Sequence, residues 1–164
     1  MVHCINFLPA DLLRETNVCV IVNIPKIIRG LIMIQTSAIH HMALTVSDTA
    51  RSKDFFMKFL GFNHIVDLGP KVLLTNGATV LALNPPPDAS QAIDNDSFSE
   101  HRIGLDHVSL TVENHEALEA AVKLFDENNI AHGDINDLSP HGLPIYVLAF
   151  RDPDNIQLEL TAPK

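Results

Sequence analysis

Two stretches of the chain alternate apolar and polar residues in nearly the same order. Residues 40–46 read HHMALTV, and residues 106–112 read DHVSLTV. Successive side chains of a β-strand point to opposite faces of its sheet. Each stretch therefore predicts a strand with one fully apolar face, suited to lie under a helix, and one polar face. His41 and His107 occupy the same position on the two polar faces.

The residues beside these histidines fall on the other face of each strand. His40 points to the apolar side, and Asp106 is its counterpart in the second stretch. The last strand candidate of the chain, IQLEL, alternates in the same way, with Glu159 on its polar side. We therefore take His41 rather than His40 as the equivalent of His107.

The segments that follow the two strands also correspond. After the first, residues 49–61 have Phe and Leu at helical spacing, begin after the N-cap candidate Asp48 and end at Gly61. Three short strand candidates follow, NHIVDL, KVLLT and ATVLALN, with Gly-Pro and Asn-Gly turn signals between them. The pattern of this half is β-α-β-β-β.

The second half repeats that order. A strand over residues 105–112 precedes the N-cap candidate Asn114 and a helix over residues 115–129. Strand candidates then lie near residues 130–135, 145–150 and 156–160. A duplicated unit of this size predicts an α+β fold of two βαβββ modules joined in one mixed sheet. We place module one at 37–84, a linker without apolar periodicity at 85–103 and module two at 104–164.

The first 36 residues do not fit the repeat. Their apolar stretch VCVIVNIPKIIRGLIMI is too short and too interrupted for a membrane span. Asp11 and Glu15 are unsuited to the start of a signal peptide. We expect either a poorly ordered or flap-like extension, or a chain whose translation begins at Met33, and in both cases residues 1–32 should be dispensable.

Composition narrows the classes of partner. The chain has 164 residues, of which 46% are hydrophobic and 19% charged, and its net charge is -9. It has no cluster of Lys and Arg, as a nucleic-acid or anionic membrane surface would require. We therefore expect a small-molecule ligand, a second copy of the chain, or both. The only cysteines, Cys4 and Cys19, lie near the N-terminus, which favours a cytoplasmic protein.

Two histidines and a carboxylate on polar strand faces are the donor types of a divalent-metal site. His41, His107 and Glu159 would together leave a net charge of about +1 on a bound divalent ion. Three protein ligands leave positions open for substrate or water. Each residue alone is more often structural, so the prediction depends on their combination.

Several motifs resemble the vicinal oxygen chelate superfamily, which includes glyoxalase I, bleomycin-resistance proteins, extradiol dioxygenases and fosfomycin-resistance enzymes. The motifs are HHMALTVSD, FFMKFLGF, LDHVSLTV and FRDPDNIQLEL, and they span about residues 39–164. The resemblance implies a mixed, cup-shaped incomplete barrel with helices outside and one metal at its base. His41, His107 and Glu159 match its ligand positions, whereas Ala82 stands where glyoxalase I has a fourth ligand.

A three-ligand set resembles the extradiol dioxygenases and the fosfomycin-resistance enzymes more than glyoxalase I. Ala43 stands where the fosfomycin-resistance enzymes have a threonine. The dioxygenase pattern implies a catalytic histidine and tyrosine before the glutamate, for which His141 and Tyr146 are the candidates. The resemblance thus implies a dioxygenase, or a lyase or isomerase, using Fe²⁺, Mn²⁺, Zn²⁺ or Ni²⁺ on a substrate with vicinal oxygens. A metal-free binding protein of the bleomycin-resistance type is the alternative.

The oligomeric state is expected to be a homodimer. The sequence leaves open whether the two modules that form a cup come from one chain or from two. It also leaves open the substrate and the identity of the metal.

Overall fold

The computed structural model describes residues 34–93 and 96–164. Residues 38–164 form one compact unit. The predictions for residues 1–32 lie outside the described residues. No helix in the described part of the chain is long and apolar enough to cross a bilayer.

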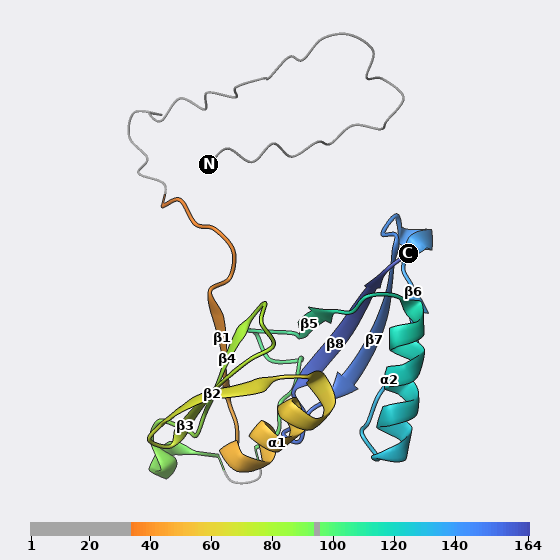
Figure 1. The fold of residues 1–164 in the computed structure, drawn as a ribbon. Coiled ribbons are helices and arrows are strands. Elements are labelled where there is room, and N and C mark those ends of the chain that lie inside the picture. Colours follow the sequence, from red (N-terminus) through yellow and green to blue (C-terminus); the bar gives the residue numbers. More distant parts are fainter. Residues whose placement is uncertain (1–33, 94–95) are drawn as a thin grey trace, which may run out of the picture. The chain divides into compact units, whose positions relative to one another are not determined.

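Module one contains one helix and one four-stranded sheet (Figure 1). Its sheet has the order β1-β4-β3-β2, in which β1 pairs with β4 in parallel and the other neighbours are antiparallel. The helix α1 starts after Asp48, whose side chain accepts hydrogen bonds from two amides of the first turn, and ends at Gly61 in the left-handed conformation. The elements are β1 (His41–Thr45), α1 (Thr49–Leu60), β2 (Asn63–Leu68), β3 (Lys71–Thr75) and β4 (Val80–Asn84).

Module two repeats this arrangement. Its sheet has the order β5-β8-β7-β6, again with one parallel pair, β5 with β8. Asn114 caps the helix α2, which packs along β7 and β8 (Figure 1). Two short 3-10 helices, Ala89–Gln91 and Ser139–His141, lie in the linker and in module two. The other elements are β5 (Val108–Thr111), α2 (His115–Glu127), β6 (Asn136–Asp137), β7 (Ile145–Arg151) and β8 (Gln157–Pro163).

The two modules confirm the α+β class and the duplicated βαβββ unit. The prediction of a strand over residues 130–135 was wrong in extent, because only an isolated bridge between His132 and Phe150 forms there. Regular pairing begins later, at Asn136 and Asp137. The two sheets remain separate in the described residues, so the mixed sheet predicted from the repeat is divided between two four-stranded halves.

The alternation of faces is as predicted. In β1, Leu44 is buried whereas Ala43 and Thr45 are exposed. In β8, Leu158 and Leu160 are buried under α2, on the face opposite Glu159. The apolar faces supply the core, and the polar faces of β1 and β5 remain accessible in the single chain.

A tight turn between β7 and β8 of module two makes hydrogen bonds with module one. Asp154 of this turn accepts hydrogen bonds from the backbone amide of Ser47 at 3.0 Å and from its hydroxyl at 2.5 Å. The guanidinium of Arg51 donates to the same carboxylate at 2.7 Å. Ser47 lies just before the N-cap of α1, and Arg51 lies in the first turn of that helix. One carboxylate of module two therefore binds the N-terminal end of the module-one helix.

The same turn contains a buried carboxylate, Asp152. Its Oδ1 accepts hydrogen bonds from the amides of Asp154 and Ile156, both at 2.8 Å, whereas its buried Oδ2 has no hydrogen-bond partner. Burial raises the pKa of Asp152 from 3.8 to about 6, because the charged form loses its hydration, and the nearby Asp154 adds to this effect.

Asp152 should therefore give the fold a pH dependence that Asp152→Asn removes. Because the pKa of Asp152 is higher in the folded state, protonated Asp152 stabilises the fold. This stabilisation is complete below about pH 4 and is lost as the pH rises through about 6. Between about pH 4.5 and about pH 7.5 the parent should lose about 2 kcal/mol of its free energy of unfolding through the ionisation of Asp152. Asp152→Asn cannot ionise and should not show this loss. Urea unfolding at the two pH values measures this, and equal pH dependence in both proteins would contradict it.

Candidate functional site

Two of the three predicted ligands lie together in module two. His107 precedes β5, and Glu159 lies in the neighbouring strand β8, opposite Ser109. The distance between His107 Nε2 and Glu159 Oε1 is 4.0 Å. The Glu159 side chain is 19% exposed and that of His107 39%, so a ligand could reach both.

The other ring nitrogen of His107 is held by its neighbour. Asp106 Oδ1 lies 2.6 Å from His107 Nδ1. A carboxylate at Nδ1 selects the tautomer with the proton on that nitrogen, which leaves the lone pair of Nε2 available for a ligand. Asp106 was not predicted to have a role, although its position before the histidine was visible in the sequence.

His41 has a different neighbour at the corresponding position. His40 Nδ1 lies 3.0 Å from His41 Nδ1, and the two rings meet edge to face. The residue before the histidine thus contacts Nδ1 in both modules, but only module two supplies a carboxylate. His41 is exposed at the start of β1.

The single chain does not bring all three residues together. Among the described residues, no group of three or more His, Cys, Asp or Glu side chains is arranged to hold a metal. His107 and Glu159 form a pair, and His41 is outside it. The assignment of His41, His107 and Glu159 as ligands of one ion therefore stays a prediction.

The strand register places Ala82 at the position equivalent to Glu159. Ala43 lies opposite Ala82 in module one, as Ser109 lies opposite Glu159 in module two. Ala82 is 8% exposed, and Leu73 lies beside it on the next strand. Module one therefore has a methyl group where module two has a carboxylate.

The structure does not bring Tyr146 to Glu159. In β7, Ala149 pairs with Glu159, and Tyr146 pairs with Ala162, so alternation places Tyr146 on the opposite face of the sheet. Its ring packs against His115 at the start of α2, with 4.6 Å between ring centroids. Leu148 and Phe150 alternate with it on the helix side, which is the signal in the sequence that could have indicated this face.

His141 lies near the other end of the same sheet. It ends the 3-10 helix before β7, where Ile145 pairs with Pro163. Glu159 is four positions before Pro163 along β8, a distance of about 13 Å. Within one chain this placement does not support His141 as a neighbour of the His107–Glu159 pair.

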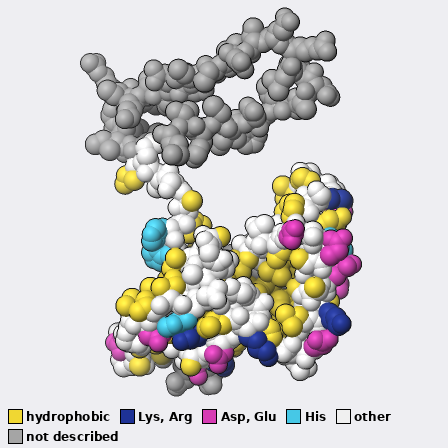
Figure 2. Space-filling model, in the orientation of Figure 1, with side chains coloured by type: hydrophobic (Ala, Val, Ile, Leu, Met, Phe, Trp, Pro, Cys, Tyr) yellow, Lys and Arg dark blue, Asp and Glu magenta, His cyan; other side chains and the backbone are white. Residues whose placement is uncertain are grey.

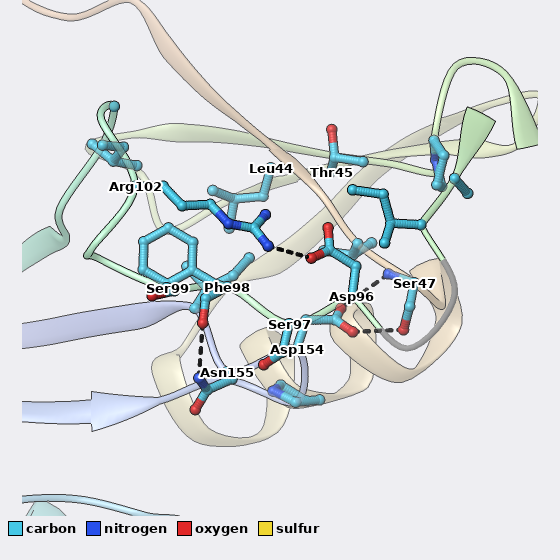
Figure 3. Close-up of a pocket in the computed structure, with 18 of the residues that line it drawn as sticks. Leu44, Thr45, Ser47, Asp96, Ser97, Phe98, Ser99, Arg102, Asp154 and Asn155 are labelled. Atoms are coloured by element: carbon cyan, nitrogen blue, oxygen red, sulfur yellow. Dashed lines mark hydrogen bonds and ion pairs between the residues drawn. The ribbon is translucent and has the colours of Figure 1, made fainter.

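A cleft of about 940 Å³ opens elsewhere, between the linker and the end of β1 (Figure 3). Arg102 and Asp96, both linker residues, form an ion pair at 3.0 Å inside it, and the Asn155 side chain donates to the carbonyl of Phe98. None of the predicted ligands lines this cleft. We place the candidate chemistry at the His107–Glu159 pair because there a histidine directly before β5 and a carboxylate of the neighbouring strand β8 lie 4.0 Å apart, and the other ring nitrogen of the histidine is already bonded to Asp106.

Apolar side chains gather in the hollow between α1 and α2 (Figure 2). A cleft of about 300 Å³ is present there. It has no titratable side chain in its lining and offers surface for packing rather than for chemistry. Its lining includes Phe59, Leu60, Val112, Ala117, Ala121 and Leu124.

The donor set of module two fits a divalent ion. Two ligands that each lie about 2.1 Å from an ion, at tetrahedral or octahedral angles, are about 3 to 3.5 Å apart. The 4.0 Å between His107 Nε2 and Glu159 Oε1 requires only a small side-chain rotation to reach that separation. The orienting carboxylate of Asp106 is the kind of outer partner that metal-binding histidines have.

Most of the chain matches the model of a known protein family. The family model described as the glyoxalase/bleomycin resistance protein/dioxygenase superfamily matches residues 38–160. The chain belongs to this superfamily. The match covers both modules and the linker, and it confirms the family resemblance of the sequence motifs. No match was found among curated proteins.

Solved structures share the fold. A glyoxylase/bleomycin resistance protein/dioxygenase domain from Frankia sp. EAN1pec is 26% identical, with a TM-score of 0.64 over 79% of this chain and 94% of that one. A lactoylglutathione lyase from Agrobacterium tumefaciens is 22% identical, with a TM-score of 0.60 and coverage of 77% and 94%. A fosfomycin resistance protein from Listeria monocytogenes is 13% identical, with a TM-score of 0.62 and coverage of 79% and 96%. At these identities the last two show the common fold alone.

Proposed function

We propose that this protein is a metal-dependent enzyme that acts on a small substrate bound through two vicinal oxygens. The observation that carries the proposal is the His107–Glu159 pair, with 4.0 Å between Nε2 and Oε1 and with Asp106 held against Nδ1 of His107. His41 would be the third ligand. Membership of the superfamily supports this reading, because lyases and fosfomycin-resistance proteins share the fold.

Each residue of the proposed site would have a distinct role. His107, Glu159 and His41 hold the ion, and Asp106 orients His107. When bound, a divalent ion with three protein ligands supplies a Lewis acid with open positions for two substrate oxygens. Dioxygenase chemistry and lyase or isomerase chemistry both remain within the proposal, with Fe²⁺ suited to the first and Mn²⁺, Zn²⁺ or Ni²⁺ to the second. A cytoplasmic enzyme fits its cysteine usage.

We further propose that a second copy of the chain supplies His41. β1 and β5 are each the terminal strand of their sheet, so one edge of each has no strand partner in the described residues. His41 lies at the start of β1 and His107 directly before β5. Pairing of β1 from one chain with β5 from another would bring the two exposed polar faces together, and two-fold symmetry would then create two equivalent sites in a homodimer.

Metal binding tests the proposed function directly. The purified protein should bind about one divalent ion per chain, and His107→Ala or Glu159→Ala should weaken binding by at least about 100-fold, because each removes a ligand. Elemental analysis and Zn²⁺ titration measure this, and Glu127→Ala, a change at the exposed end of α2, is the control. A parent protein that binds no Fe²⁺, Mn²⁺, Zn²⁺ or Ni²⁺ would contradict the proposal and favour a metal-free binding protein.

A further inference from the structure

Three polar side chains form a continuous chain of contacts on the open face of module two. Thr161 Oγ1 lies 3.1 Å from Glu159 Oε1, and Ser109 Oγ lies 2.5 Å from Thr161 Oγ1. Ser109 stands directly opposite Glu159 in the β5–β8 pair. Two hydroxyls from neighbouring strands are therefore arranged around the carboxylate that lies beside His107.

The chemistry of the groups sets the direction of this chain. An ionised carboxylate only accepts hydrogen bonds, and a threonine hydroxyl has a single proton. Thr161 must use that proton to bond Glu159, so the hydrogen bond between the hydroxyls must be donated by Ser109. The order is Ser109 to Thr161 to Glu159. A hydroxyl that accepts one hydrogen bond becomes a better donor in the next, and a bond to a charged acceptor is stronger than a neutral one.

We propose that Thr161, supported by Ser109, is a positioning residue that fixes the Glu159 carboxylate for metal binding. This inference rests on the proposed function of Glu159 as a ligand. A glutamate side chain has several rotatable bonds, and ordering it on binding costs entropy. The Thr161 hydroxyl already holds Glu159 Oε1, which reduces that entropic cost and keeps the carboxylate next to His107. Outer partners of metal ligands typically contribute about 10- to 100-fold in affinity.

Module one provides an internal comparison. The positions equivalent to Ser109, Glu159 and Thr161 are Ala43, Ala82 and Asn84. The two hydroxyls thus occur in the module that has the carboxylate, and neither occurs in the module that lacks it. A general need for hydroxyls on this face of the sheet does not explain that difference, whereas support of Glu159 does.

Thr161→Val tests the inference, since it removes the hydroxyl at nearly constant volume. We expect the Zn²⁺ affinity of the full-length protein to fall by about 10- to 100-fold, with the melting temperature of the metal-free protein little changed. Thr161→Ser should restore the affinity. Ser109→Ala should weaken it several-fold, with no further loss in the Thr161→Val background, because the serine acts through Thr161. Thr111→Val, on the same exposed face but without a bond to Glu159, is the matched control.

The outcomes separate this inference from the proposed function. Zn²⁺ binding by the parent that is lost in Glu159→Ala but unchanged in Thr161→Val would overturn the positioning role and leave the metal site intact. An equal loss in Thr161→Val, Thr161→Ser and Thr111→Val would also overturn it, because the effect would then come from strand packing. A parent without Zn²⁺ affinity would overturn both. If Thr161→Val fails to fold, unchanged Zn²⁺ affinity in Ser109→Ala would contradict the proposed support of Glu159 through Ser109 and Thr161.

Discussion

Two variants that each fail to bind metal should recover binding when they are combined in one dimer. In a dimer whose site takes His41 from one chain and His107 with Glu159 from the other, a His41→Ala chain paired with a Glu159→Ala chain has one site with both defects and one intact site. Each homodimer should lose at least about 100-fold in affinity, and the mixed dimer should bind about one ion with parental affinity. This expectation follows from the separation of His41 from the His107–Glu159 pair in the single chain.

The experiment requires chains with two different affinity tags, co-expressed so that mixed dimers form during folding. Metal content and Zn²⁺ affinity of the doubly purified species are the measurements. The control is a mixture of His107→Ala and Glu159→Ala, in which both sites carry a defect in either arrangement. Recovery only in the first mixture supports a site shared between chains. No recovery in a verified mixed dimer would show that each chain builds its own site or that the three residues do not form one.

Ala82→Glu should convert the proposed three-ligand site into a four-ligand site. The strand register puts residue 82 where Glu159 stands in the other module, on the face shared with His41. A second carboxylate would neutralise the remaining positive charge on the ion, so metal retention should rise or stay level. Activity that needs an open coordination position should fall.

The stability of the same variant separates a position beside the metal from simple packing. Ala82 is buried, and without metal an unpaired carboxylate there should destabilise the fold by several kcal/mol, roughly 3. Metal at about 100 times its Kd stabilises a native state by about 2.7 kcal/mol, so Zn²⁺ should recover much of the loss. Melting temperatures with and without Zn²⁺ measure this, with Ala82→Gln as the neutral control of equal size. A loss that Zn²⁺ does not recover would show that residue 82 is not beside the ion.

The sequence predictions that the structure confirms are those that rest on local patterns of apolar and polar residues. The period of two along β1, β5 and β8 places the polar residues on one face and the buried leucines on the other, and helical spacing with Asp48 and Asn114 as caps predicts α1 and α2. The repeat also aligned Ala82 with Glu159, which the observed register bears out. These features depend on residues a few positions apart, so a linear sequence contains them.

Pairing between distant segments was decided by the tertiary structure. The antiparallel register of β7 on β8 turns Tyr146 toward α2 and away from Glu159. The contact of Thr161 with Ser109 joins residues 52 positions apart. Such contacts depend on which strands become neighbours and in what register, and many registers satisfy the same alternation of apolar and polar residues.

The sequence by itself determined the α+β class, the duplicated module, the face of each strand and the donor types on it. Only the tertiary structure decided that His107 and Glu159 meet, that Asp106 and Thr161 hold them, and that His41 stands apart within one chain. The physical reason is that the face of a side chain follows from local backbone geometry, whereas its neighbours follow from packing of the whole domain.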